Sequence, residues 1–406
     1  SMLQELGLSE SLDAVQLLDM YGYSLLEKLN KRSSDFFLNA IATAEKIGIE
    51  NHPVVFHAQL NYGLSSLLKD GPFENYVDLM VNSLRKQYQN NFGLYNESER
   101  EQFWSRFSLL NDILFSCRVS DSNNGSLYDY LLMTKGMLLN TSTSMAELIN
   151  KSNNQELIAD YSQLQNIRTK VAKLEQMPIA DRPESVDSLV NLAEKIERRL
   201  ITRSKDYGEY TSISNVSWND IGSALKKNDV AVEFVDFMDY KANKEIYAAL
   251  VLRKGWRQPQ FVTIADSEVL NSIISNDNRL PYDVRINNIY SDSALYENIW
   301  TPLEQFLQEG DNVYVSASGI LHNLSIEHLA DENEVHACDK YNIRRVSSTR
   351  DLAVRKDASS CVYRSATLFG GIQYDLDIDT MTLESEKYTV NPTRSVELES
   401  TDTLRS

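Results

Sequence analysis

The stretch VYVSASGILHNLSIEHLA, residues 313–330, carries three side chains that could do chemistry close together: His322, Glu327 and His328. Imidazole and carboxylate groups transfer protons and bind metal ions. Apolar residues alternate before the polar turn at Ser318-Gly319. The pattern therefore predicts a strand, then a turn, with this group of side chains just beyond it.

Two further residues extend the group, His336 and Cys338. The histidines at 322, 328 and 336 are six and eight residues apart, which fits no zinc-site template. We therefore expect no metal and no cofactor. A His336–Cys338 dyad would have to come from one short loop, whereas nucleophile and base normally come from separate elements that leave room for a substrate. We therefore do not assign catalysis to this pair.

A second polar stretch, FGGIQYDLDID, follows another apolar run. Gly370-Gly371 lacks both GxGxxG spacing and a P-loop lysine, so it predicts a tight exit from a strand and no phosphate site. Beyond it, Asp375, Asp377 and Asp379 alternate. The simplest interpretation is a solvated acidic loop.

The elements that precede these stretches are helical. SLDAVQLLDMYGYSLLEKLN and HPVVFHAQLNYGLSSLLKD share apolar residues at spacings of three and four, and each has a glycine beside aromatic residues, Gly22 and Gly63. Such segments predict short, closely packed helical hairpins in a tetratricopeptide-like solenoid. An irregular helical bundle is the alternative.

A long helix is expected over residues 96–116, capped by Asn96 or Ser98. Residues 154–177 and 185–204 predict a long antiparallel hairpin with two facing apolar stripes. The stripes consist of Leu157, Tyr161, Leu164, Ile167 and Val171 on one helix, and Leu189, Leu192, Ile196 and Leu200 on the other.

After about residue 215 the pattern changes to β-branched and aromatic runs separated by helical segments, which predicts an α/β sheet. The expected strands are 230–237, 245–255, 260–266, 312–318, 341–349 and 366–375, with a helix at 298–307. From Thr380 the chain is polar and reads as an exposed tail.

Composition excludes several classes of protein. The chain has 406 residues and a net charge of −18, and it contains no basic patch, so we expect no direct binding to nucleic acid. The three cysteines form no CxxC pair, which suits a reducing compartment such as the cytoplasm. No apolar run is long enough to span a membrane, and we expect no membrane association.

Several phrases, taken in order, resemble bacterial proteins in which tetratricopeptide repeats precede a CHAT domain, a caspase-like peptidase domain related to separase. They are NESEREQFW, YDYLLMTKGMLLNTS, VSWNDIGSALKKNDVAVEFVDF, YAALVLRKG, VYVSASGILHNLSIEHLA, IRRVSSTRDL and ATLFGGIQYD, and they cover roughly residues 95–376. The resemblance implies a cysteine endopeptidase with a His-Cys dyad. It also implies that His322 lies in the pseudo-catalytic half and has a structural role.

In this family a histidine followed by glycine ends one strand and a cysteine ends the next, both after the strand that here reads ATLFGG. This chain has no His-Gly dipeptide and no cysteine after Cys361. We therefore assign no catalytic residue here and expect the chain alone to be inactive. We expect a second, dyad-bearing C-terminal fragment as partner, a protein substrate, and a possible protein activator on the repeats.

The predicted fold class is α plus α/β: helical repeats at 1–95, a helical region with a long hairpin at 96–212, the leading part of a caspase-like α/β domain at 213–379, and a polar tail at 380–406. The predicted function is the regulatory, large fragment of a CHAT endopeptidase. The alternative is a non-enzymatic, acidic helical-repeat scaffold that binds a protein partner.

The resemblance also suggests weaker sites. In caspase-like geometry the loop after ATLFGG borders the substrate pocket, where Asp375 or Asp377 could bind a substrate arginine. Arg394 and Arg405 in the polar tail are candidate processing sites, because caspase-like enzymes are often cut between their large and small parts. The alternative is that the C-terminus has no processing role.

Overall fold

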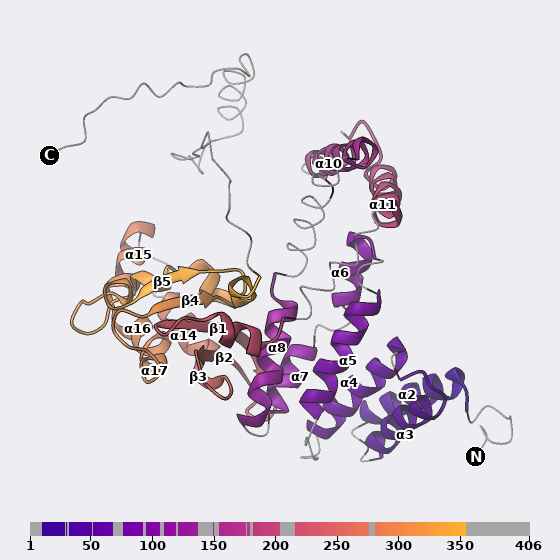
Figure 1. Cartoon of the computed structure of the whole chain (residues 1–406), viewed down its shortest axis with the longest axis horizontal. Coiled ribbons are helices and arrows are strands. Elements are labelled where there is room, and N and C mark those ends of the chain that lie inside the picture. Colours follow the sequence, from indigo (N-terminus) through magenta and orange to yellow (C-terminus); the bar gives the residue numbers. More distant parts are fainter. Residues whose placement is uncertain are drawn as a thin grey trace. The chain divides into compact units, whose positions relative to one another are not determined.

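The structure is a computed structural model, and Figure 1 shows its elements. It describes residues 10–28, 30, 32–50, 52–67, 76–91, 95–105, 109–118, 121–136, 149, 154–175, 177–178, 182–203, 216–275 and 281–354. Of residues 90, 91, 282, 283, 285 and 291 it describes the backbone alone.

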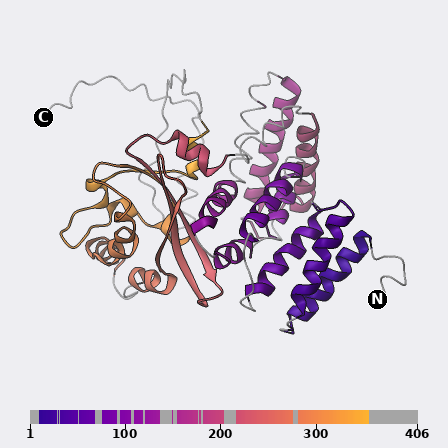
Figure 2. The ribbon, with the colours of Figure 1, turned by 60° about the horizontal axis from the view of Figure 1, so that its bottom comes forward.

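Four helices in the described N-terminal residues pack in chain order (Figure 2). They are α2 (Leu12–Leu26), α3 (Ser33–Lys46), α4 (Pro53–Leu67) and α5 (Tyr76–Asn91). A Cβ atom at Gly22 would lie 2.7 Å from the Phe37 ring, and one at Gly63 would lie 2.0 Å from the Tyr76 hydroxyl. The predicted close packing at both glycines is therefore present.

Hydrogen bonds to the buried Asp19 hold α2 against α4. His57 Nδ1 lies 2.6 Å from an oxygen of Asp19, and the Asn61 amide donates to the other Asp19 oxygen at 2.9 Å. The hydrogen bond to Asp19 raises the pKa of His57, against the opposing effect of burial. These hydrogen bonds therefore fix the position of α2 on α4.

The predicted single helix over residues 96–116 is wrong: the structure has two helices there, α6 (Glu97–Ser105) and α7 (Leu110–Ser116). The cap prediction holds at Asn96, whose side chain accepts from the Glu99 N–H at 2.9 Å. α7 is instead oriented by strand β1 (Asp229–Asp239), because Asp112 accepts from the Met238 N–H at 3.0 Å. These tertiary contacts outweigh a continuous helical pattern.

The next helices are α8 (Asn124–Thr134), which follows the 3-10 turn η2 (Asp121–Asn123), and the pair α10 (Gln155–Glu175) and α11 (Val186–Arg203). Ion pairs Arg199–Asp160 and Lys170–Glu184 fix the antiparallel register of α10 and α11.

The α10–α11 hairpin has its own hydrophobic core. The predicted stripes meet there, with Leu164 and Leu200 fully buried. Leu192 is the exception: it is 42% exposed, and Ala193 packs against the core in its place. The stripe on α11 therefore runs along a slightly different line from the predicted one.

The C-terminal part contains a five-stranded mixed sheet in the order β3-β2-β1-β4-β5. Its strands are β1 (Asp229–Asp239), β2 (Lys244–Arg253), β3 (Gln260–Asp266), β4 (Asn312–Ser316) and β5 (Asn342–Arg345). β1, β2 and β3 are antiparallel neighbours, whereas β4 is parallel to both β1 and β5. The strands predicted in these ranges are confirmed.

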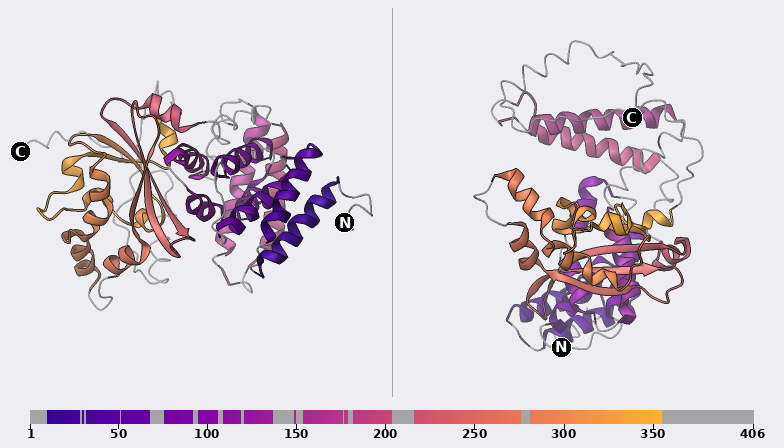
Figure 3. Two further views of the ribbon diagram at one scale, coloured as in Figure 1. Left: turned by 90° about the horizontal axis from the view of Figure 1, so that it is seen from below. Right: turned by 90° about the vertical axis from the view of Figure 1, so that its left-hand side faces the viewer.

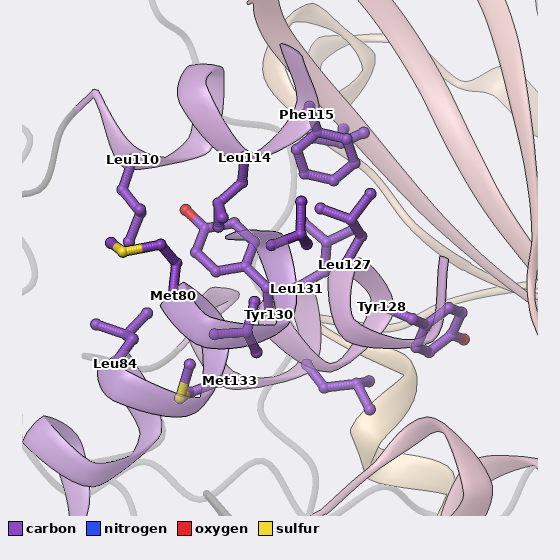
Figure 4. Packing of buried hydrophobic residues seen from close by; sticks show 14 of the residues in the cluster. Met80, Leu84, Leu110, Leu114, Phe115, Leu127, Tyr128, Tyr130, Leu131 and Met133 are labelled. Carbon is purple, nitrogen blue, oxygen red and sulfur yellow. The ribbon is translucent and has the colours of Figure 1, made fainter. Parts of the chain in front are cut away.

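Helices cover both faces of this sheet (Figure 3). Because side chains alternate along a strand, Ala231 and Val235 of β1 join one core with α7 and α8, while Val230 and Val232 join another. Figure 4 shows the first core from close by, with Phe115 of α7 and Leu127 of α8 beside the strands. The fold is thus α plus α/β.

Short helices and 3-10 turns complete the layers on the two faces of the sheet. They are α13 (Trp218–Ala224), α14 (Ser267–Ile274), α15 (Tyr282–Ser291), α16 (Ala294–Ile299), α17 (Thr301–Glu304) and α18 (Ala337–Lys340), with 3-10 turns η5 (Gly319–Asn323), η6 (Ile326–His328) and η7 (Thr349–Leu352).

The single helix predicted at 298–307 is wrong, because α16 and α17 are separate. Trp300 lies between them, fully buried, and its indole N–H donates to the Ile326 carbonyl at 2.7 Å. Pro302 at the start of α17 supports a new helix start. Across the described ranges, none of the helices combines the length and the apolar composition that a bilayer crossing requires.

Candidate functional site

A polar junction lies where the parallel strands β1, β4 and β5 approach their carboxyl ends. Such ends are where ligand sites form in α/β sheets. Lys135, the residue after α8, reaches in with its Nζ atom, which donates to the Ser316 hydroxyl at 3.0 Å and to the Ala317 carbonyl at 3.2 Å. The same Nζ lies 2.9 Å from an oxygen of Glu233.

Glu233 is the acidic centre of this junction. Its side chain is fully buried in the middle of β1 and points to the α8 side of the sheet. One carboxylate oxygen accepts from the Ser348 hydroxyl at 3.1 Å, from the Thr349 N–H at 2.6 Å and from the Thr349 hydroxyl at 2.8 Å. Tyr128 of α8 adds a 2.8 Å bond to that hydroxyl. The carboxylate is thus held from two elements besides its own strand.

Arg350 closes the junction from the other side. It is buried and donates to the carbonyls of Leu132 and Lys135, the latter at 3.3 Å. Burial lowers the pKa of both Arg350 and Lys135, while attraction to Glu233 opposes the shift for each. A buried lysine of lowered pKa can act as a base or nucleophile. Here its contacts are all internal, so the junction connects helices to the sheet and does not meet a substrate.

An acidic pocket of about 470 Å³ opens at the side of β1 and β2. Three carboxylates, Asp112, Asp236 and Glu245, line it together with Asn111, Phe237 and Met238. Burial raises the pKa of Asp112, the Met238 N–H opposes this, and repulsion from Asp236 and Glu245 adds to it. The pocket favours a cationic group, such as a guanidinium, by simple charge attraction.

The turn beyond β4 packs against this pocket wall. Ser318 donates a hydrogen bond to Asp236, and Ile320 N–H donates to the Tyr247 hydroxyl at 3.0 Å. Gly319 has φ +51°, and a Cβ there would lie 2.3 Å from the Tyr247 hydroxyl. The predicted turn at Ser318-Gly319 is confirmed, and only glycine fits its second position.

The predicted group of histidines separates in space. His322 lies in η5 with an exposed side chain, and among the described residues it makes no hydrogen bond. Glu327 pairs instead with Arg345, at 2.8 and 3.0 Å. His336 lies 3.5 Å from Asp339. The interpretation that His322 stabilises a turn through its side chain therefore has no hydrogen bond to support it.

Cys338 contacts His328, with 3.7 Å between Sγ and Nδ1. The sequence points to His336, two residues away, as the nearest imidazole, but the chain folds back between the two segments. In the described part of the chain, no three histidine, cysteine, aspartate or glutamate side chains converge as metal ligands.

The remaining predicted site residues lie outside the described residues. These are the pocket candidates Asp375 and Asp377, the processing candidates Arg394 and Arg405, and the expected strand from Ala366. Each of these assignments stays a prediction.

Sequence reasoning did not single out Lys135, Glu233 or the pocket. Glu233 carries a usable signal, because a carboxylate flanked by apolar residues in the run VAVEFVDF needs a buried partner. Asp112 and Asp236 are far apart in sequence, and no local pattern links them. In comparison with known proteins, the sequence matches no protein-family model and no curated protein.

Proposed function

We propose that this chain is the large, regulatory part of a caspase-like CHAT cysteine endopeptidase, which cleaves a protein substrate through a His-Cys dyad carried by a further part of the protein. The resemblance of the ordered phrases motivates the proposal. The observation that carries it is the parallel array β1-β4-β5, in which β5 pairs with β4 alone among the described strands. The other edge of β5 can pair with the strands on which this family carries the dyad.

The helical part is the proposed binding site for a protein partner or activator. The polar junction supports this role, because Lys135 and Arg350 connect the end of α8 to the strand ends of the sheet. A partner that shifted α8 would move groups hydrogen bonded to Ser316 and Glu233. The proposal includes a location in the bacterial cytoplasm: the family that the chain resembles is bacterial, and the chain's three cysteines, none in a CxxC pair, suit a reducing compartment.

The test compares this chain with the longer parent protein that the proposal requires. Each is incubated with casein and with arginyl fluorogenic peptides, with and without iodoacetamide. We expect iodoacetamide-sensitive cleavage by the parent and none by this chain. Cleavage by this chain that disappears in Cys338→Ala would contradict the proposal, because the nucleophile would then be Cys338. A parent without a strand ending in His-Gly and another ending in cysteine would reject peptidase function.

The second candidate is a non-enzymatic scaffold. Exposed apolar side chains on α2 and α3 favour it: Met20 is 68% exposed, Tyr21 55% and Leu38 45%. Such side chains suit contact with a protein partner. The sequence of the parent protein distinguishes the peptidase from the scaffold, because a scaffold needs no His-Cys dyad.

A further inference from the structure

Two exposed residues with complementary chemistry meet on the connection between β4 and β5. Cys338 is the second residue of α18, and His328 is the last residue of η6. The backbone brings them together, because Ala337 N–H donates to the Leu329 carbonyl at 2.9 Å and Ala330 forms an isolated β-bridge with His336. The segment between them is thus a closed loop.

The pair is fixed from both sides although its own side chains are exposed. Ala337 and Leu329, the immediate neighbours of Cys338 and His328, are both fully buried. They hold the backbones in place, and the Sγ and Nδ1 atoms lie 3.7 Å apart. An imidazole at this position can accept the thiol proton, and the thiolate is the reactive form of cysteine.

The other described cysteine provides a contrast within the same chain. Cys117 is fully buried, and burial raises the pKa of its thiol well above the ordinary value. Reagents in solution therefore reach Cys338 and not Cys117. Neither Cys338 nor His328 lines the acidic pocket of Asp112, Asp236 and Glu245.

We propose that Cys338 and His328 form a modification site at which small disulfides, positively charged ones fastest, exchange with the Cys338 thiol. The preference for positive charge comes from the exposed acidic residues of the same loop, Glu332, Glu334 and Asp339, and from the net charge of −18. The site does not depend on the peptidase proposal.

The exchange balances without any other oxidant. The Cys338 proton passes to His328 Nδ1, and the thiolate attacks one sulfur of the disulfide. The bond between the two reagent sulfurs breaks as the new bond to Cys338 forms. The released thiolate takes the proton back from His328. Cys338 is oxidised to a mixed disulfide, and half of the reagent is reduced to a thiol.

The test uses the full chain with Cys361→Ser, since Cys361 lies outside the described residues. Cystamine, which is doubly positive, is compared with glutathione disulfide, and adducts are located by peptide mass mapping. We expect one adduct, on Cys338. Cystamine should react about tenfold faster at low salt, with the difference shrinking as salt is added. Modification of Cys117 at the same rate, or faster reaction of glutathione disulfide at low salt, would overturn the proposal.

The role of His328 is tested with a matched pair of variants. His328→Gln should slow the exchange by about tenfold, because the proton acceptor is lost. His336→Gln, which changes the other histidine of the loop, should leave the rate unchanged. In urea strong enough to unfold the chain, the variant with His328→Gln and the Cys361→Ser reference chain should exchange at equal rates. Equal exchange rates of the two folded chains would reject the role of His328 as proton acceptor for Cys338.

Discussion

Glu233 illustrates how one residue decides the arrangement of elements far from it. A carboxylate buried in the middle of a strand is costly unless charged and polar groups surround it. Lys135 provides the charge, and Thr349 provides two of the hydrogen bonds. The helix end and the loop after β5 are therefore drawn to the same point on β1.

We expect Glu233→Gln to lower the free energy of unfolding by about 3–5 kcal/mol, because it leaves Lys135 buried without its counter-charge. The measurement is urea unfolding followed by circular dichroism. Glu245→Gln, which changes an exposed carboxylate on β2, is the control and should have little effect. The double variant Lys135→Met, Glu233→Gln should be more stable than Glu233→Gln alone. If Glu233→Gln were as stable as the unchanged chain, the Lys135–Glu233 pair would contribute nothing to stability.

At the scale of elements, two glycines set the spacing of the N-terminal helices. Gly63 of α4 lies against Tyr76 of α5, whose hydroxyl donates to the Gln59 carbonyl at 3.2 Å. Gly22 receives the Phe37 ring of α3 in the same way. Aromatic rings therefore pack directly onto helix backbones, which no larger residue at these positions would allow.

We expect Gly63→Ala to destabilise the chain by about 1–3 kcal/mol through this clash, despite the better helix propensity of alanine. Gly222→Ala is the matched control in another helix, α13, where the nearest atom to a Cβ is 3.9 Å away. That substitution should stabilise the chain by up to about 1 kcal/mol. Opposite signs in thermal unfolding support the packing argument, whereas stabilisation by both would refute it.

At the scale of the whole molecule, the described residues fall into separate hydrophobic cores. One core joins α4, α5, α7 and α8 to one face of the sheet, and another lies on the opposite face. The α10–α11 hairpin has a core made of its own residues together with Ile149. Stability should therefore differ between the hairpin and the rest.

We expect Leu164→Ala to weaken the hairpin by about 2–4 kcal/mol, because Leu164 is fully buried in its core. Hydrogen exchange should speed up in α10 and α11 and stay unchanged in α8 and β1. Leu192→Ala, on the exposed side of α11, should change exchange in none of these elements. Equal acceleration in β1 would mean that the cores unfold together.

The sequence was most informative where a pattern repeats over many residues. The β-branched runs predicted β1 to β5, and the spacing of three and four predicted the α10–α11 hairpin. It was least informative where a tertiary contact decides, as at Trp300, which ends one helix by packing under Ile326. The His328–Cys338 contact depends on a loop that folds back, and no spacing rule reveals it.

The bond from Arg350 to the Leu132 carbonyl spans 218 positions of the chain. During synthesis at about 5–20 residues per second, the two partners emerge from the ribosome roughly ten to forty seconds apart. Throughout that interval Lys135 and the end of α8 lack the contacts that η7 later provides. The helical part of the nascent protein therefore stays incomplete until η7, the turn after β5, has been synthesised. We expect chaperones to bind the nascent chain mainly during that period.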